Sequence, residues 1–173
     1  MVIGMKSSTQ VIAVAGLVVG GVLGMVGTMV TQQNVRALSW GIDGSALVVA
    51  ACLLAIRHFR KGNDCVAAGF LVFAIGEGVM LGGTAGSLEA SVPSFAAGTA
   101  LWAAGLLLTG IPKEFALWTR AASIAAGILF AIVSARIFWG QLLLPTAKPL
   151  PYFAYPFLVL SFAGWIWALL RAD

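Results

Sequence analysis

Apolar stretches of about twenty residues follow one another along almost the whole chain, with only short polar connections between them. Because an α-helix rises about 1.5 Å per residue, each stretch can cross the roughly 30 Å hydrocarbon core of a bilayer. The sequence therefore predicts an all-α integral membrane protein with a single transmembrane domain, residues 1–173. We expect a six-helix bundle with spans at residues 11–30, 37–56, 65–83, 93–111, 115–138 and 151–170.

The composition excludes a soluble globular domain as the main body of the chain. Hydrophobic residues make up 61% of the sequence and charged residues 9%, whereas about a quarter of the residues of a soluble domain are charged. The net charge of +4 does not indicate nucleic-acid binding, because no basic patch is interleaved with aromatic residues. Lys and Arg in the connections of a membrane protein explain this charge, and the lipid bilayer is the predicted partner.

The distribution of Lys and Arg predicts the orientation of the spans. Six spans put both termini on one side, and most of the 10 basic residues fall on that side. These residues are Lys6, Arg57, Arg60, Lys61, Lys113, Arg120 and Arg171, whereas Arg36, Arg136 and Lys148 fall on the other side. The positive-inside rule then places both termini in the cytoplasm, and we expect a plasma or inner membrane.

Two neighbouring spans each contain one carboxylate. Asp43 and Glu77 are almost equally far from the basic turn at residues 57–64, so antiparallel packing puts them at the same height. Both would lie roughly 9–10 Å inside the hydrocarbon, where a charge costs a few kcal/mol. Two facing carboxylates would repel each other, so we expect a shared proton or a cationic partner. Alternatively, they reach interfacial water, or bond Ser39 or Ser45 and specify only helix packing.

Arg136 is the candidate counter-ion of these carboxylates. It lies near the end of the span at residues 115–138, so it is either the partner of Asp43 or Glu77 or an arginine that extends to the interface. We predict that Asp43, Glu77 and Arg136 form a binding site. The single histidine, His58, is predicted to be a solvated residue of the basic turn.

The remaining reactive residues indicate no catalytic centre, metal site or cofactor. Cys52 lies in the middle of its span and Cys65 at the turn end of the next, so the two thiols are too far apart in height to pair. Neither has the spacing of a metal ligand or a redox pair, and both are interpreted as small apolar fillers. One histidine cannot supply a pair of histidine ligands.

Glycines recur at helical spacing and predict close contacts between helices. The candidate packing residues are Gly16, Gly20, Gly24, Gly69, Gly76, Gly98 and Gly105. Such small residues let two helix backbones approach closely, but the pattern leaves open whether the partner belongs to this chain or to another subunit. Trp102 shares a face with two of them and is expected to pack against a glycine face or to sit in a cavity.

Three functions remain open at this level. The intramembrane carboxylates and glycine-rich faces favour a small transporter or channel for a solute, an ion or a proton. The glycine faces and the lack of a soluble domain equally fit an accessory subunit of a larger membrane complex, or a homo-oligomer. A lipid-acting enzyme with two catalytic carboxylates is the third possibility, and an enzyme is the least favoured of the three.

Overall fold

The computed structural model describes residues 7–84 and 86–171, and these are helical apart from short connections. The helices are α1 (Ser8–Met29), α2 (Gln33–Arg60), α3 (Asp64–Leu81), α4 (Val92–Gly110), α5 (Leu117–Phe138), the short 3-10 helix η1 (Tyr152–Ala154) and α6 (Tyr155–Arg171). Counting η1 with α6, six helices are long and apolar enough to cross a membrane. The described ranges contain no strand, so the all-α prediction is confirmed.

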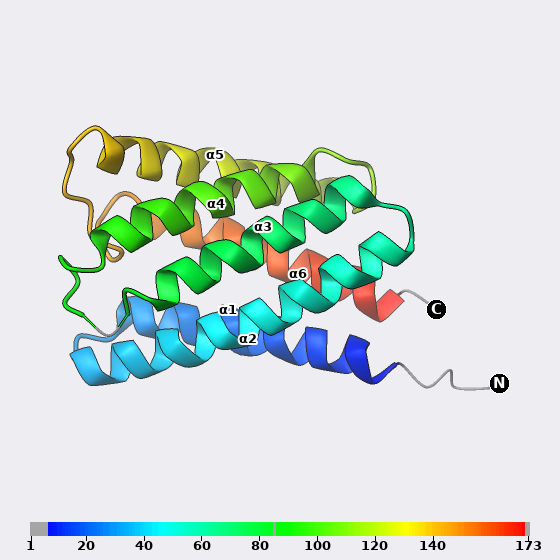
Figure 1. Ribbon diagram of the computed structural model, residues 1–173, viewed down its shortest axis with the longest axis horizontal. Helices are drawn as coiled ribbons and strands as arrows, with labels where there is room; N and C mark the ends of the chain where they lie inside the picture. Colours follow the sequence, from blue (N-terminus) through cyan, green and yellow to red (C-terminus); the bar gives the residue numbers. More distant parts are fainter. Residues whose placement is uncertain (1–6, 85, 172–173) are drawn as a thin grey trace.

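The helices run back and forth along the long axis of the bundle (Figure 1). The start of α1, the end of α6 and the α2–α3 and α4–α5 connections lie at one end, which we call the termini end. The α1–α2, α3–α4 and α5–α6 connections lie at the opposite end, which we call the far end. Each helix therefore packs antiparallel to the next one in the chain.

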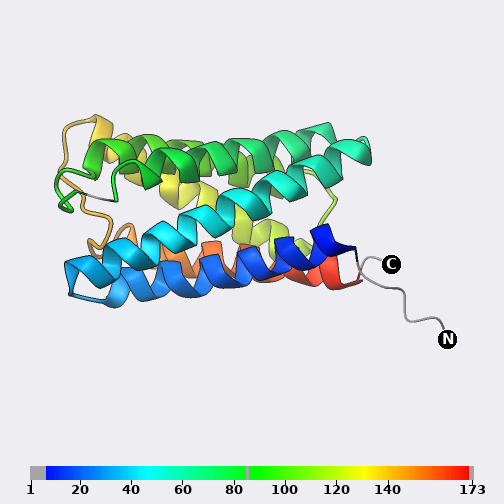
Figure 2. The same cartoon turned by 60° about the horizontal axis from the view of Figure 1, so that its bottom comes forward.

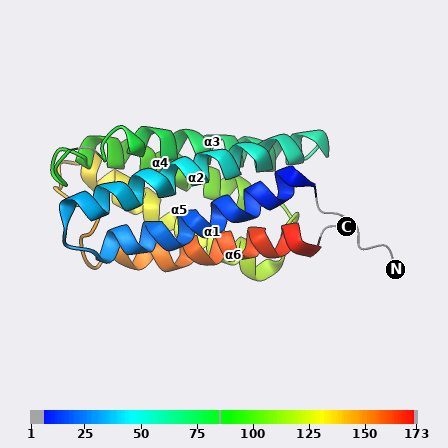
Figure 3. The ribbon, with the colours of Figure 1, turned by 90° about the horizontal axis from the view of Figure 1, so that it is seen from below.

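The six helices form a closed ring. Each helix packs against its neighbours in sequence, and α6 packs against both α5 and α1. The side-by-side course of α1 and α6 is visible in two further views (Figures 2 and 3). The side-chain amide of Gln10 donates to the backbone carbonyl of Leu169 and joins these two helices at the termini end. A ring of this kind has an interior, and the side chains that line it decide whether it is filled.

Glycines of α1 lie directly against α2. A Cβ atom added to Gly16 would lie 2.7 Å from the backbone oxygen of Ala46, and one added to Gly20 would overlap the side chain of Leu47. Further along, a Cβ atom on Gly24 would lie 2.8 Å from Oδ2 of Asp43. The partner of the first glycine face therefore belongs to this chain, and the third glycine makes room for a carboxylate.

Glycines of α3 and α4 pair with each other across the helix contact. A Cβ atom on Gly105 would lie 2.7 Å from the backbone oxygen of Gly69, and one on Gly98 would lie 2.9 Å from that of Gly76. At both levels backbone meets backbone, which is the closest approach that two helices can make. The second set of predicted packing glycines thus also finds its partner within the chain.

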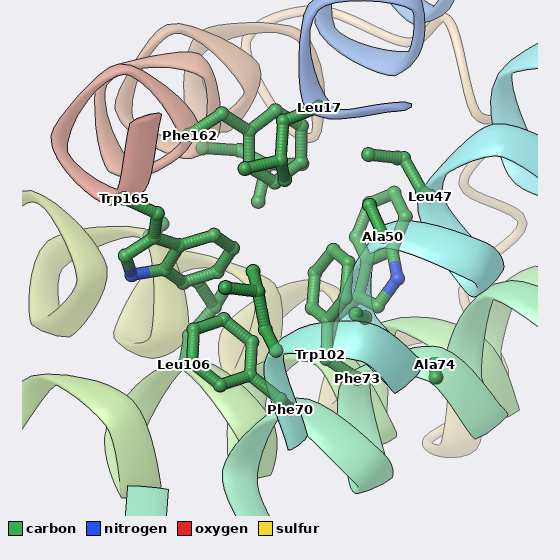
Figure 4. Close-up of a cluster of buried hydrophobic side chains, with 14 of the residues drawn as sticks. Leu17, Leu47, Ala50, Phe70, Phe73, Ala74, Trp102, Leu106, Phe162 and Trp165 are labelled. Carbon is green, nitrogen blue, oxygen red and sulfur yellow. The ribbon is translucent and has the colours of Figure 1, made fainter. Parts of the chain in front are cut away.

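The ring interior is filled with aromatic side chains from its middle towards the termini end. Phe70 and Phe73 of α3 meet Trp165 of α6 with ring centroids 4.8 Å and 5.9 Å apart, and Phe162 lies 5.9 Å from Phe73. Figure 4 shows side chains from α1, α2, α3, α4 and α6 converging on this cluster. We call Phe70, Phe73, Phe130, Phe162 and Trp165 the aromatic core.

The prediction that His58 is a solvated turn residue is wrong. Helix α2 continues to Arg60, so His58 lies one turn after Leu54 on the face that points into the ring. The imidazole is 5% exposed and its ring centroid lies 5.5 Å from those of both Phe70 and Phe115. The basic turn is shorter than the sequence predicts, because helical geometry continues through Arg57 to Arg60.

Candidate functional site

The far-end half of the ring interior holds a cavity of about 310 Å³. All three far-end connections contribute to its lining, and several side chains there, such as Thr31, Ser87 and Glu89, are exposed. Deeper lining residues, including Glu77 and Trp102, are buried. The cavity therefore runs from the surface of the far end inward to the edge of the aromatic core.

Both predicted carboxylates line this cavity. Asp43 enters from α2 beside Gly24, and Glu77 enters from α3 with only 3% of its surface exposed. The two residues lie on adjacent packed helices and line the same cavity. The prediction that they lie at one height on facing helices thus agrees with the geometry, since residues equidistant from the α2–α3 turn become neighbours.

The two carboxylates have no protein partner in the described part of the chain. Oδ1 of Asp43 and Oε1 of Glu77 are buried without a hydrogen bond, and neither residue is in an ion pair there. A buried carboxylate without a partner costs several kcal/mol, so such a group takes up a proton or binds a cation. The cavity beside them offers the space for either.

The structure does not bring Arg136 to the carboxylates. Arg136 lies in the last turn of α5, is half-buried, and donates from Nε to Oε1 of Gln141 at 2.6 Å. It is not among the residues that line the cavity. The physical reason is that α5 packs against α4 and α6, whereas the carboxylates lie on α2 and α3. Of the two interpretations, the side chain that extends away from the carboxylates fits the structure.

The cavity has a different arginine, Arg36, near its opening. Its guanidinium donates to the backbone oxygens of Gly27 and Val30 and lies 5.9 Å from the ring centroid of Trp40. These carbonyls belong to the C-terminal end of α1, where a cation is favourable. Sequence reasoning placed Arg36 in a polar link and missed this role, although a basic residue shortly after a helix end is the expected signal.

Trp102 forms part of the inner wall, and Tyr155 lines the cavity at the far-end start of α6. The indole of Trp102 stacks on Phe73 with a centroid distance of 5.5 Å and an interplanar angle of 11°, and it also packs against Gly76. Its Nε1 is buried without a hydrogen-bond partner, and the residue lines the cavity. Both expectations for Trp102, glycine packing and a cavity position, therefore hold together. Tyr155 donates to the backbone oxygen of Pro145 at 2.8 Å.

A second polar pair lies at the termini end, on the other side of the aromatic core. Nδ1 of His58 is 3.9 Å from Oε1 of Glu114, which is the limit of an ion pair. Neither residue lines the cavity. Cys52 and Cys65 are both free. Within residues 7–84 and 86–171, no group of three or more His, Cys, Asp or Glu residues could hold a metal ion.

Comparison of the chain with protein-family models, with curated proteins and with solved structures gives no match. The geometry of the cavity is therefore the basis for a functional proposal.

Proposed function

We propose that the chain is a multi-pass integral membrane protein that binds a proton or a small cation at Asp43 and Glu77 as a step in transport. The hydropathy of the six helices supports the membrane position. The distribution of Lys and Arg supports cytoplasmic termini in a plasma or inner membrane. In this orientation the far end faces outward, and so does the opening of the cavity.

One observation carries the proposal. Two carboxylates, Asp43 and Glu77, line one cavity and have buried oxygen atoms without a hydrogen bond. A membrane protein that needed these residues only for packing would satisfy them with a hydroxyl, an amide or a basic group, because an unpaired charge in a low-dielectric site is costly. A site that binds and releases a cation needs carboxylates without a fixed protein partner. The cation itself is the partner, and it must be able to leave.

The shape of the interior favours a carrier over an open channel. The cavity reaches from the far end to Trp102 and Phe162, where the aromatic core begins. Phe70, Phe73 and Trp165 are each at most 1% exposed and fill the remaining interior. A bound cation can therefore reach the termini end only if the helices around the aromatic core move apart. That requirement is the defining feature of alternating access.

The test is ion exchange in vesicles. The purified full chain is reconstituted into liposomes that contain a pH-sensitive dye, and an outward or inward gradient of a cation is imposed. We expect proton movement coupled to the cation gradient, and loss of this coupling in Glu77→Gln and Asp43→Asn. Glu114→Gln is the matched control because Glu114 is an exposed carboxylate at the termini end that does not line the cavity. Normal coupling in the Asp43→Asn/Glu77→Gln double variant would overturn the proposal.

A second candidate function, an accessory subunit or a homo-oligomer, is favoured by a different surface. A shallow groove between α1 and α2 on the outside of the ring is lined by small residues, including Ala15, Gly41 and Ser45. A Cβ atom on Gly41 would meet nothing within 4 Å. Small residues of this kind admit a helix of another subunit. If the groove is an interface, Gly41→Leu changes the oligomeric state in detergent and leaves ion exchange by monomers intact.

A further inference from the structure

We infer that the ligand of the cavity is an organic ammonium ion with an apolar body, rather than a bare inorganic cation. The inference rests on the proposed function and names the chemical class of its substrate. The ammonium group would lie between Asp43 and Glu77, and the apolar body would lie against Trp102 and Phe162 on the inner wall.

The size of the cavity favours an organic ligand. Its volume of about 310 Å³ lies at the lower end of the roughly 300–1,000 Å³ range of small-molecule pockets. A water molecule takes up about 30 Å³ of liquid volume, so a single dehydrated metal ion would leave most of this space empty or wet. A small amine with an aliphatic or aromatic body matches the cavity better.

The walls of the cavity are mostly apolar. Helices α1, α2, α3, α4 and α6 contribute side chains of Leu, Met, Val and aromatic residues to it. The lining includes Met25, Leu47, Met80, Leu158 and Phe162. Pockets for organic ligands have this composition, with a few polar groups that fix the orientation of the ligand. Here Asp43 and Glu77 supply those polar groups.

A cationic side chain of the protein already covers one aromatic ring of the lining. The guanidinium of Arg36 already lies 5.9 Å from the centroid of Trp40, which is a cation–π distance. Because this guanidinium also bonds the carbonyls of Gly27 and Val30, its charge is compensated by the end of α1. The charge that an incoming ligand meets is therefore set by the carboxylates deeper in the cavity.

A second, independent observation points to a ligand. Trp102 is 7% exposed, its Nε1 has no hydrogen-bond partner, and the residue lines the cavity next to the carboxylates. A buried indole N–H without an acceptor is open to a hydrogen bond that the protein does not supply. Nε1 of Trp165 in the aromatic core is also unpaired but does not line the cavity, so it is the position of Trp102 beside the carboxylates, together with its open N–H, that points to a ligand.

The oxygen atoms near the carboxylates do not form a cage for a metal ion. Hard cations such as Ca²⁺ take about six to eight oxygen ligands in proteins. The nearby backbone oxygen of Gly24 already accepts hydrogen bonds from Thr28 and Trp40. An ammonium group needs only three acceptors, because it carries three N–H donors. The pair Asp43 and Glu77 can supply them.

The test compares three probes by titration calorimetry on the full chain in detergent. The probes are 2-phenylethylamine, its neutral counterpart 2-phenylethanol, and sodium chloride. We expect the amine to bind, and the alcohol to bind at least about tenfold more weakly because it gains no charged hydrogen bond. Glu77→Gln should weaken amine binding by at least the same factor, whereas Glu114→Gln, at a carboxylate that does not line the cavity, leaves it unchanged. A monodisperse elution profile and an unchanged helical spectrum control for folding.

Substitutions of Trp102 on the inner wall test separately where the apolar body of the ligand lies. Trp102→Phe keeps an aromatic surface and should retain most amine binding, whereas Trp102→Leu should weaken it. Equal weakening by both variants would contradict the position of the body. Equal binding of the alcohol and the amine would contradict the ammonium site.

The failures of the two proposals can be told apart. If sodium or a proton binds at Glu77 and the amine does not compete, the organic ligand is overturned and the proposed function stands. If neither the amine nor sodium binds, and vesicles show no proton exchange that depends on Glu77, both are overturned.

Discussion

The two halves of the ring interior are built from the same helices but have opposite contents. Towards the termini end, Phe70 and Phe73 of α3 fill the space together with Trp165 of α6. Towards the far end, α3 instead places the buried carboxylate of Glu77 inside the ring, and Glu77 lines a cavity. A change of side chains along one helix thus converts a packed interior into a hollow one.

Helix α1 shows the same change. Leu17 is 1% exposed and belongs to the packed half, whereas Gly20, Gly21 and Gly24 line the cavity. Glycine has no side chain that could fill the interior, so the space beside these three residues stays open. One half of the interior is densely packed and the other is open, so we expect substitutions in the packed half to cost more stability than substitutions around the cavity.

The largest expected effect tests the backbone contact between α3 and α4. Gly105→Leu should destabilise the protein by about 3 kcal/mol or more, because its Cβ would lie 2.7 Å from the backbone oxygen of Gly69. The measurement is thermal unfolding in detergent together with the yield of monodisperse protein.

The matched control for this glycine is Gly78→Ala, where a Cβ atom meets nothing within 4 Å. It should leave stability unchanged or raise it by about 0.5 kcal/mol, since alanine favours the helix. A wild-type melting temperature for Gly105→Leu would contradict the close contact.

The next effect sharpens the contrast between the packed and the hollow half. Phe70→Ala should cost about 2–4 kcal/mol because the side chain is fully buried and packs against His58, Phe115 and Trp165. Val159→Ala, on the wall of the cavity, should cost less than about 1 kcal/mol because the space beside it is already open. Denaturant unfolding of both variants provides the comparison. Similar losses for both would show that the two halves contribute equally.

A smaller effect of opposite sign is expected in the cavity. Glu77→Gln removes a buried carboxylate that has no partner in the described structure and that faces Asp43. Stability should therefore stay the same or rise by up to about 1 kcal/mol, while amine binding and ion exchange are lost. The measurement is thermal unfolding of the ligand-free protein. A loss of stability comparable to that of Phe70→Ala would mean that the carboxylate is a structural group.

The smallest effect is expected for the polar pair at the termini end. Glu114→Gln should change stability by less than about 0.5 kcal/mol, because the side chain is 32% exposed and its oxygen lies 3.9 Å from Nδ1 of His58. Thermal unfolding at low and high salt checks this. A larger loss of stability would show that the contact between His58 and Glu114 holds the helices together at the termini end.

The sequence was sufficient to predict the helices but not their contacts. Long apolar stretches separated by polar connections predict six helices, and the structure has them. Helix ends are less certain, because α2 extends through the basic residues to Arg60 and buries His58. Periodic glycines predict a close contact but not a partner, since that depends on which residue of another helix lies opposite.

The candidate site was predicted in part. Asp43 and Glu77 could be paired from their equal distance to one turn, because an antiparallel hairpin leaves little freedom. Arg136 could not be placed in the same way, since it lies on a helix that is three connections away from α2. The cavity itself could not be predicted, because an empty volume depends on the side chains of five helices at once.

The most direct test of the central claim is infrared difference spectroscopy of the side-chain carboxyl groups in the purified full chain. The spectrum is recorded at constant pH before and after addition of 2-phenylethylamine, with Glu77→Gln and Asp43→Asn used to assign the bands. The amine should shift the carboxyl bands of wild type, and the shift should disappear in Glu77→Gln but persist in Glu114→Gln, whose carboxylate does not line the cavity. Carboxyl bands that ignore the amine, sodium and pH would contradict the central claim, and would make Asp43 and Glu77 structural residues of the bundle.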